Sequence, residues 1–134
     1  MKTLKTIFAV IVMTIATVLM SSEVSAQKLS NQQLEAVAAE LTKQLPMAVE
    51  KGMTWTAIRF NSASATMNMT FKIDPSLMGI SLDQAKKELN GMSNSDFREL
   101  VGQEFTDMMN LLGCKVQVIF EYPYKTTKKF LFEQ

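Results

Sequence analysis

The chain has 134 residues, of which 47% are hydrophobic, 20% charged and 8% aromatic, the composition of one globular domain, so large multidomain enzymes are excluded. Lysine and arginine number 14 against 13 acidic residues, a balance that provides no strong field for nucleic acid or an anionic membrane. The sequence contains no histidine and one cysteine, which excludes Ser-His-Asp and Cys-His catalysis, histidine-containing zinc sites and an intrachain disulfide.

Residues 1–26 have the organisation of a secretory signal peptide. Two lysines precede an apolar stretch at residues 7–20, and the small residues Val24 and Ala26 stand at the third and first positions before a cleavage site. A helix of that length would span about 21 Å, less than the roughly 30 Å hydrocarbon core, so we expect no stable membrane anchor. The sequence therefore predicts an exported protein, periplasmic or extracellular, whose single mature domain covers residues 27–134 and is formally neutral.

A helix is predicted from Ser30 onwards. Ser30 and Gln33 have the spacing of a capping box, which satisfies backbone N–H groups at a helix start. Pro46 predicts the end of this helix, because proline disfavours helical geometry in the residue before it. The apolar residues between them recur at three- and four-residue steps and form one stripe: Leu34, Val37, Ala38, Leu41 and Leu45.

From Thr54 the pattern changes to the two-residue period of β-strands. Apolar and polar residues alternate from residue 65 to residue 73, which predicts a strand with one face on a core and the other in water. Residues 54–60 are its expected hairpin partner, with a turn at residues 61–64.

Two helices are predicted after this hairpin. The first begins with a capping box at Ser81 and ends at Gly91. The second begins at Asp96 and continues to a glycine cap at Gly113. Gly102 lies inside the second helix and should weaken it by about 1 kcal/mol relative to alanine.

A second hairpin closes the chain. Residues 115–122 alternate as a third strand, residues 123–127 form a turn, and residues 128–132 return as a fourth strand. The order of elements is α-ββ-αα-ββ. It favours an α+β fold in which a four-stranded antiparallel sheet, made of two hairpins, has the helices packed on one face.

Two helix-to-strand junctions can be compared with known proteins. They are residues 45–50, which read Leu-Pro-Met-Ala-Val-Glu, and Gly113 followed by Val116, Val118, Phe120 and Tyr122. Together they resemble a group of small exported bacterial proteins of unknown function. The resemblance covers most of the mature chain and implies export and the fold, although the cysteines of many such proteins do not match Cys114. It implies no catalytic residue.

Cys114 and the carboxylates offer little catalytic chemistry. Cys114 follows a helix C-terminus, where the helix dipole disfavours a thiolate, so we expect a small buried residue, or else an intermolecular disulfide. The acidic residues fall on polar helix faces or in first turns, where solvation and capping account for them. We therefore predict no catalytic residue, no metal site and no cofactor, with a small carboxylate-dependent hydrolase as the alternative.

The predicted strand registers, Phe60 with Ala65 and Phe120 with Phe130, place one face of each hairpin outside the core. An exposed apolar patch there would suggest a protein partner or a homodimer. The alternative is a bulge near Trp55 that turns its ring inward, or coverage of the face by a terminus. This outer face would carry five candidate binding residues: Trp55, Arg59, Lys72, Ile119 and Leu131.

We therefore expect an exported, non-catalytic binding or accessory module of the bacterial envelope or extracellular space, with a structural homodimer as a further alternative. Nucleic acid is not an expected partner, because the basic cluster near the C-terminus is short and contains no arginine. Lysines on an edge strand more often prevent sheet-to-sheet aggregation.

Overall fold

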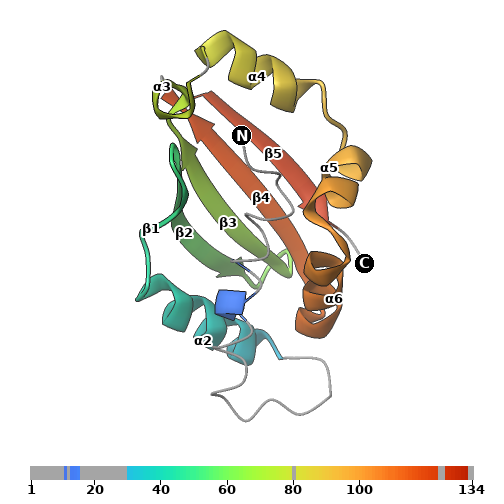
Figure 1. The fold of residues 1–134 in the computed structure, drawn as a ribbon. Coiled ribbons are helices and arrows are strands. Elements are labelled where there is room, and N and C mark those ends of the chain that lie inside the picture. The colour runs from blue at the N-terminus through green and yellow to red at the C-terminus, as the bar shows by residue number, and fades with distance from the viewer. Residues whose placement is uncertain (1–10, 12, 16–29, 80, 124–125, 133–134) are drawn as a thin grey trace.

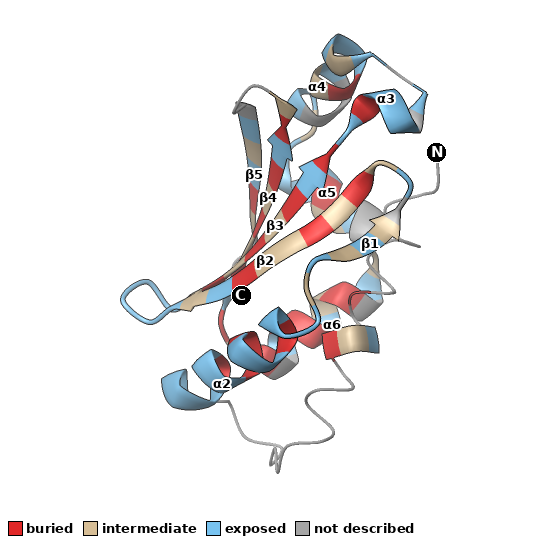
Figure 2. Ribbon diagram, turned by 90° about the vertical axis from the view of Figure 1, so that its left-hand side faces the viewer, coloured by how far each residue is buried: buried red, intermediate tan, exposed pale blue. Residues whose placement is uncertain are grey.

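The computed structural model of the protein describes residues 11, 13–15, 30–79, 81–123 and 126–132. Within them, one five-stranded sheet carries the helices on one side (Figure 1, Figure 2). The α+β class is as predicted, but the sheet has five strands where four were expected. In chain order, which is also their spatial order, the strands are β1 (Met47–Glu50), β2 (Met53–Asn61), β3 (Thr66–Ile73), β4 (Lys115–Tyr122) and β5 (Thr126–Phe132).

The sheet is mixed and not antiparallel throughout. β1, β2 and β3 form an antiparallel meander, and β4 and β5 form an antiparallel hairpin. Between these two units β3 and β4 are parallel, with Thr66 opposite Lys115 and Lys72 opposite Glu121. The predicted antiparallel arrangement is wrong at this junction, because the helical connection returns the chain to the opposite end of the sheet, and β4 then begins beside the beginning of β3.

The additional strand, β1, is a short edge strand. Met47 lies opposite Trp55 and Ala48 opposite Thr54, after which the register shifts. A tight turn follows, in which Gly52 has a φ of 90°. Four residues are too few to show a two-residue period, so this strand could not be predicted from its residues.

The first helix, α2 (Asn31–Thr42), begins as predicted. The Ser30 hydroxyl accepts a hydrogen bond from the Gln33 backbone N–H at 3.2 Å, and the Gln33 side chain accepts one from the Ser30 N–H at 2.8 Å. At the other end of the helix, the Thr42 hydroxyl donates to the Ile58 carbonyl on β2 at 3.3 Å. The buried stripe of α2 consists of Leu34, Val37, Ala38 and Leu41, all of which were predicted. Leu29, which the sequence predicts to pack against Leu34 as a hydrophobic staple at this helix start, lies outside the described residues.

Four helices connect β3 to β4, whereas the sequence predicted two helices in this connection. Two tertiary hydrogen bonds hold this connection against the second hairpin: the Tyr122 hydroxyl donates to the Ala85 carbonyl at 3.4 Å, and the Leu131 N–H donates to the Asn94 side chain at 3.2 Å. The helices are α3 (Pro75–Met78), α4 (Leu82–Asn90), α5 (Asn94–Val101) and α6 (Gln103–Leu112).

The predicted helix from Asp96 to Gly113 is divided into α5 and α6 by Gly102. α5 begins earlier than expected, because Ser93 and Asp96 form a capping box. Gly102 has φ 90° and ψ 170°, outside helical geometry and accessible to glycine at little steric cost. Gly102 therefore breaks the helix that it was expected only to weaken.

The core lies between the sheet and the helices, and aromatic rings cross it from β2 to β5. Trp55 stacks on Phe71 with ring centroids 6.0 Å apart, and Phe71 lies 5.7 Å from Phe120. Phe97 of α5 stacks on Phe130 at 4.1 Å and meets Phe120 edge-on at 5.7 Å. Such pairs contribute about 0.5 to 1.5 kcal/mol each beyond the area they bury, so Phe97 fixes α5 on the second hairpin.

Other predicted core residues are also buried. Cys114, directly after α6, is 6% exposed, in agreement with a structural thiol. Four methionines that fill the core are less exposed still: Met67, Met69, Met108 and Met109.

Two residues of the predicted signal peptide belong to the same core. Residues 11 and 13–15 are helical, and this short segment is drawn in blue just above α2 in Figure 1. Ile11 and Ile15 are both 0% exposed, whereas Met13 is 69% exposed. Among the described residues, no helix is both long enough and apolar enough to cross a membrane.

Candidate functional site

Trp55 lies in the core and not on the outer face. The register of β2 and β3 shifts between Trp55 and Ala57, which makes Thr56 the extra residue of a β-bulge. Trp55 therefore pairs with Phe71 on the inner face and is 0% exposed. The prediction of Trp55 as an exposed anchor is wrong, and the alternative of a bulge that turns the ring inward is confirmed.

The bulge also provides the hydrogen-bond partner of the Trp55 ring. The indole Nε1–H donates to the carbonyl oxygen of Ala57 at 3.1 Å. A buried indole N–H without an acceptor would be costly, and the acceptor here is the residue that follows the bulge. One extra residue thus places the ring in the core and satisfies its polar atom there.

The second hairpin is paired two residues away from the predicted register. Phe130 lies opposite Val118 instead of Phe120. Because a shift of two residues keeps each side chain on its face, Phe130 still points inward and Ile119 and Leu131 still point outward. The first hairpin is displaced in the same way, with Phe60 opposite Met67 instead of Ala65.

The other four candidate residues share the outer face, where they fall into three rows that cross the sheet from β2 to β5. Arg59 and Lys72 are exposed, while Ile119 and Leu131 are half-buried. The rows are Arg59, Asn68, Gln117 and Leu131; then Ala57, Thr70, Ile119 and Lys129; then Thr54, Lys72, Glu121 and Thr127.

The outer face, defined by these three rows, is polar and positively charged. Arg59, Lys72 and Lys129 carry positive charge against the single carboxylate of Glu121. Figure 2 shows the helices on the other side of the sheet, and along the strands buried residues are interspersed with half-buried and exposed ones. Without Trp55, the large apolar side chains of its three rows are Ile119 and Leu131, on neighbouring strands.

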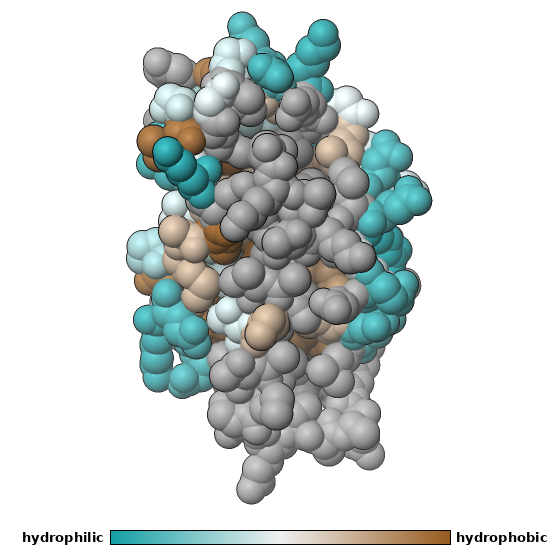
Figure 3. All heavy atoms as spheres, viewed as in Figure 1, coloured by the Kyte–Doolittle hydropathy of each residue, from teal (hydrophilic) through white to brown (hydrophobic). Residues whose placement is uncertain are grey.

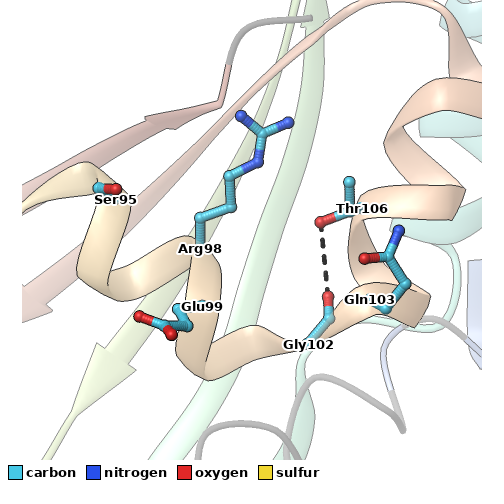
Figure 4. Close-up of a pocket in the computed structure, with 6 residues that line it drawn as sticks. All are labelled: Ser95, Arg98, Glu99, Gly102, Gln103 and Thr106. Atoms are coloured by element: carbon cyan, nitrogen blue, oxygen red, sulfur yellow. Dashed lines mark hydrogen bonds between the residues drawn. The ribbon is translucent and has the colours of Figure 1, made fainter.

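A second candidate site is a polar pocket where α5 meets α6 (Figure 4). It has a volume of about 420 Å³. The break at Gly102 forms it, and the Thr106 hydroxyl donates to the Gly102 carbonyl at 3.5 Å on its wall. Prediction from the sequence missed this pocket, because it treated the two helices as one. The lining residues are Ser95, Arg98, Glu99, Gly102, Gln103 and Thr106.

The pocket offers hydrogen bonding and no evident catalytic arrangement. The side chains of Arg98 and Glu99 point in different directions in Figure 4. Gln103 is occupied at its amide, which donates to the Asp107 carboxylate at 2.9 Å. In the described part of the chain, histidine, cysteine and acidic side chains form no group that could hold a metal ion. The polar groups that line the pocket are therefore chiefly the Arg98 side chain and the hydroxyls of Ser95 and Thr106.

The acidic side chains that the structure describes are exposed. Asp74 and Asp96 accept hydrogen bonds at helix starts, and Glu40 forms an ion pair with Lys43 at 2.8 Å. A carboxyl group that acts as a general acid near neutral pH is held in a desolvated site. These carboxylates are exposed to water, and some also accept hydrogen bonds from backbone N–H groups at helix starts. Their environment is therefore that of solvated and capping groups. They are Glu35, Glu40, Asp74, Asp83, Asp96, Glu99, Asp107 and Glu121.

Comparison with known proteins adds little to this picture. No protein-family model matches the chain. No curated protein matches it either. A solved structure of a protein from Pseudomonas aeruginosa, described as a "putative secreted protein", is similar with a TM-score of 0.47 and 12% sequence identity, over 77% of this chain and 88% of that chain. A likeness of this size does not establish a common function.

Proposed function

We propose that this protein is an exported, non-catalytic binding module that uses the outer face of its sheet. The observation that carries the proposal is the face itself, a regular surface of three rows that the helices leave uncovered (Figure 2). Export is supported by the signal-peptide organisation of residues 1–26. The compartment, periplasmic or extracellular, follows from export and is part of the same proposal.

The chemistry of the outer face favours an acidic protein partner. Arg59 on β2 and Lys129 on β5 lie at opposite sides of the face, about 14 Å apart across three strand spacings. The half-buried side chain of Ile119 lies between these strands, on β4, and that of Leu131 lies on β5, two residues from Lys129; a partner can cover both. Charges at the rim steer and orient a partner, while apolar contact at the centre excludes water.

The proposal is tested by capture from an envelope extract with the mature protein and a double variant, Arg59→Glu with Lys72→Glu. The matched control is Lys87→Glu, a charge reversal on exposed α4. We expect the wild type and the control to retain the same partner and the double variant to lose it. Retention should also fall as salt is raised, because exposed charges are screened. A partner that the double variant captures equally well would contradict the use of this face.

A structural homodimer is the second way in which the outer face could be used. Sedimentation of the mature protein distinguishes it from the binding module. The binding module should sediment as a monomer. A dimer that dissociates in the double variant but not in the control would favour the homodimer.

A further inference from the structure

The two edges of the sheet differ in how well they are protected against pairing with a further strand. β1, at one edge, has four residues and a register shift, and short or irregular edge strands pair poorly. β5, at the other edge, has seven residues in unbroken register with β4. Among the described residues β5 has a neighbouring strand on one side only, and in Figure 1 it is the last strand on the side of α5. β5 is therefore the edge that can accept another strand.

The hydrogen bond of Leu131 indicates which backbone groups of β5 point away from β4. Its N–H donates to the Asn94 side chain on α5 at 3.2 Å. In an antiparallel pair, residues that exchange hydrogen bonds with the partner strand alternate with residues whose N–H and C=O groups point away from it. Lys129 and Thr127 precede Leu131 at steps of two residues, so their N–H and C=O groups also point to the edge.

This edge is closed at one end and open at the other. At Leu131, Asn94 accepts the outward N–H, and α5 lies beside this end of β5 (Figure 1). Within the part of the chain that the structure describes, no residue pairs with the outward groups of Thr127 and Lys129, and both residues are exposed. We call residues 127–129 of β5 the open edge. Unpaired N–H and C=O groups of this kind are complementary to an extended peptide segment.

The lysines of β5 determine which extended segment fits. Lys129 is exposed on the outer face, whereas Lys128 lies over the Phe130 ring on the inner face, with its Nζ 5.3 Å from the ring centroid. Positive charge thus flanks the open edge on both faces of the sheet. A second copy of β5, paired antiparallel and centred on this opening, would place lysine opposite lysine, and like charges directly opposite each other are destabilising. An acidic segment avoids this repulsion.

We propose that the open edge binds an extended acidic segment of a partner protein as a further strand of the sheet. Backbone hydrogen bonds to Thr127 and Lys129 hold the segment, and a carboxylate beside Lys129 selects it. Figure 3 shows hydrophilic side chains over α5 and α6 on this side of the molecule, so the segment is held by its backbone and charge more than by apolar packing. The inference rests on the proposed function, because Lys129 belongs to both surfaces, and it names the part of the partner that binds.

The test is a titration of the full chain with a synthetic peptide, followed by amide hydrogen exchange in NMR spectra. The peptide Thr-Val-Glu-Val-Glu-Val-Thr, with blocked ends, places both carboxylates on one face of a strand. We expect saturable binding that slows exchange of the Thr127 and Lys129 amides by at least about 10-fold. The Leu131 amide, already bonded to Asn94, should change little. Absence of saturable binding at millimolar peptide would overturn the proposal.

Two substitutions at Thr127 separate backbone pairing from side-chain contact. Thr127→Pro removes an N–H that points away from β4, and proline is tolerated at such positions of edge strands. It should weaken peptide binding by at least about 5-fold, the loss expected for one backbone hydrogen bond. Thr127→Ala, the matched control, keeps the N–H and should bind within about 2-fold of the wild type. Equal losses in the two variants would contradict backbone pairing.

Modified peptides test the same pairing without any change in the protein. One peptide is N-methylated at both glutamates and another at the middle valine. Alternate N–H groups of a strand face the same neighbour, so one of these peptides should lose binding and the other should keep it. Equal binding of both peptides, or equal loss, would overturn the proposal even if Thr127→Pro failed to fold.

Charge reversals test the selection of an acidic segment. The peptide with lysine in place of both glutamates should bind the wild type at least about 3-fold more weakly, and so should the acidic peptide with the Lys129→Glu variant. Lys87→Glu on exposed α4 is the matched control and should bind as the wild type does. Equal binding of the acidic and basic peptides would contradict the selection. Self-association of the wild type that Thr127→Pro abolishes would identify a second copy as the occupant and overturn the proposal.

The variant Arg59→Glu with Lys72→Glu separates the open edge from the outer face. Both residues lie on β2 and β3, away from β5, so this variant should keep peptide binding. If the peptide does not bind the wild type while the double variant still loses its envelope partner, the open edge is wrong and the outer face stands. If the peptide binds and the double variant keeps the partner, the outer face is wrong and the open edge stands.

Discussion

At the scale of single residues, Trp55 decides the interpretation of the sheet. Trp55, Ala57 and Arg59 would share one face in a regular strand, but Thr56 interrupts the alternation and places Trp55 on the other side. The ring then contacts Phe71, and its N–H finds the Ala57 carbonyl. A surface residue is thereby converted into part of the core.

Burial of Trp55 predicts a blue-shifted emission that soluble quenchers do not reach. Trp55 is the only tryptophan of the chain, so the spectrum reports on it alone. Trp55→Ala should lower the free energy of unfolding by about 3 to 5 kcal/mol, because it leaves a cavity. Denaturant unfolding measures this loss, with exposed Arg59→Ala as the control. A red-shifted emission in the folded monomer would contradict the burial.

Contacts between residues that are close in sequence could be predicted well. The capping box of Ser30 and Gln33 and the hydroxyl contact of Ser81 with the Gln84 N–H form within one helical turn, so their spacing reveals them. The position of Trp55 could not be predicted in this way. Its neighbours come from another strand, and a bulge leaves no mark in the sequence of the strand that contains it.

At the scale of elements, one residue of β2 sets the faces of the residues that precede it. Deletion of Thr56 would remove the extra residue and leave Trp55 next to Ala57, so regular alternation keeps the ring on the inner face, opposite Phe71. We expect the emission of Trp55 to stay blue-shifted and the free energy of unfolding to fall by less than the loss of about 3 to 5 kcal/mol in Trp55→Ala, because no buried side chain is lost. Deletion of Ala63, in the exposed turn of the same hairpin, is the matched control. A red-shifted emission in the Thr56 deletion alone would contradict the role of Thr56 as the extra residue.

The division of α5 from α6 depends on the backbone of Gly102. Gly102→Ala forces a side chain into φ 90° and ψ 170°, a region that other residues almost never adopt. The substitution should cost about 1 to 3 kcal/mol, measured by thermal or denaturant unfolding. Asn110→Ala on the exposed side of α6 should change stability by less than about 0.5 kcal/mol. A Gly102→Ala protein as stable as the wild type would show that the two helices can merge.

Helix and strand content was predictable where a long periodic pattern was present. α2, β3 and β4 were predicted nearly to their ends, because each buries one face with a regular period. β1 and α3, with four residues each, are too short for a period. The polar pocket between α5 and α6 was missed for a related reason, since its position depends on the dihedral angles of Gly102.

At the scale of the whole molecule, the two hairpins were predictable and their relative direction was not. Each hairpin is joined by a short turn, which dictates antiparallel pairing. The direction of β4 beside β3 depends instead on where a four-helix connection ends, which no local pattern encodes. The prediction of which β3, β4 and β5 residues share the outer face was correct in spite of this error, because the alternation of side chains is independent of strand direction.

Export predicts a defined N-terminus for the mature protein. Intact-mass measurement of the exported form should place its first residue at Gln27, because Val24 and Ala26 are the small residues that precede the cleavage site. Expression of Ala26→Leu should leave the chain uncleaved. Recovery of the wild-type chain at full length from the membrane fraction would contradict the prediction.

The parallel pairing of β3 with β4 also has a kinetic consequence. The paired residues are about 50 positions apart in sequence, whereas the partners within each hairpin are close together. The entropy of closing that long loop must be overcome before the two halves of the sheet can join. We expect the hairpins to form early and their docking to limit the folding rate, so that Val118→Ala, at the centre of the junction, slows refolding more than the edge substitution Met47→Ala does.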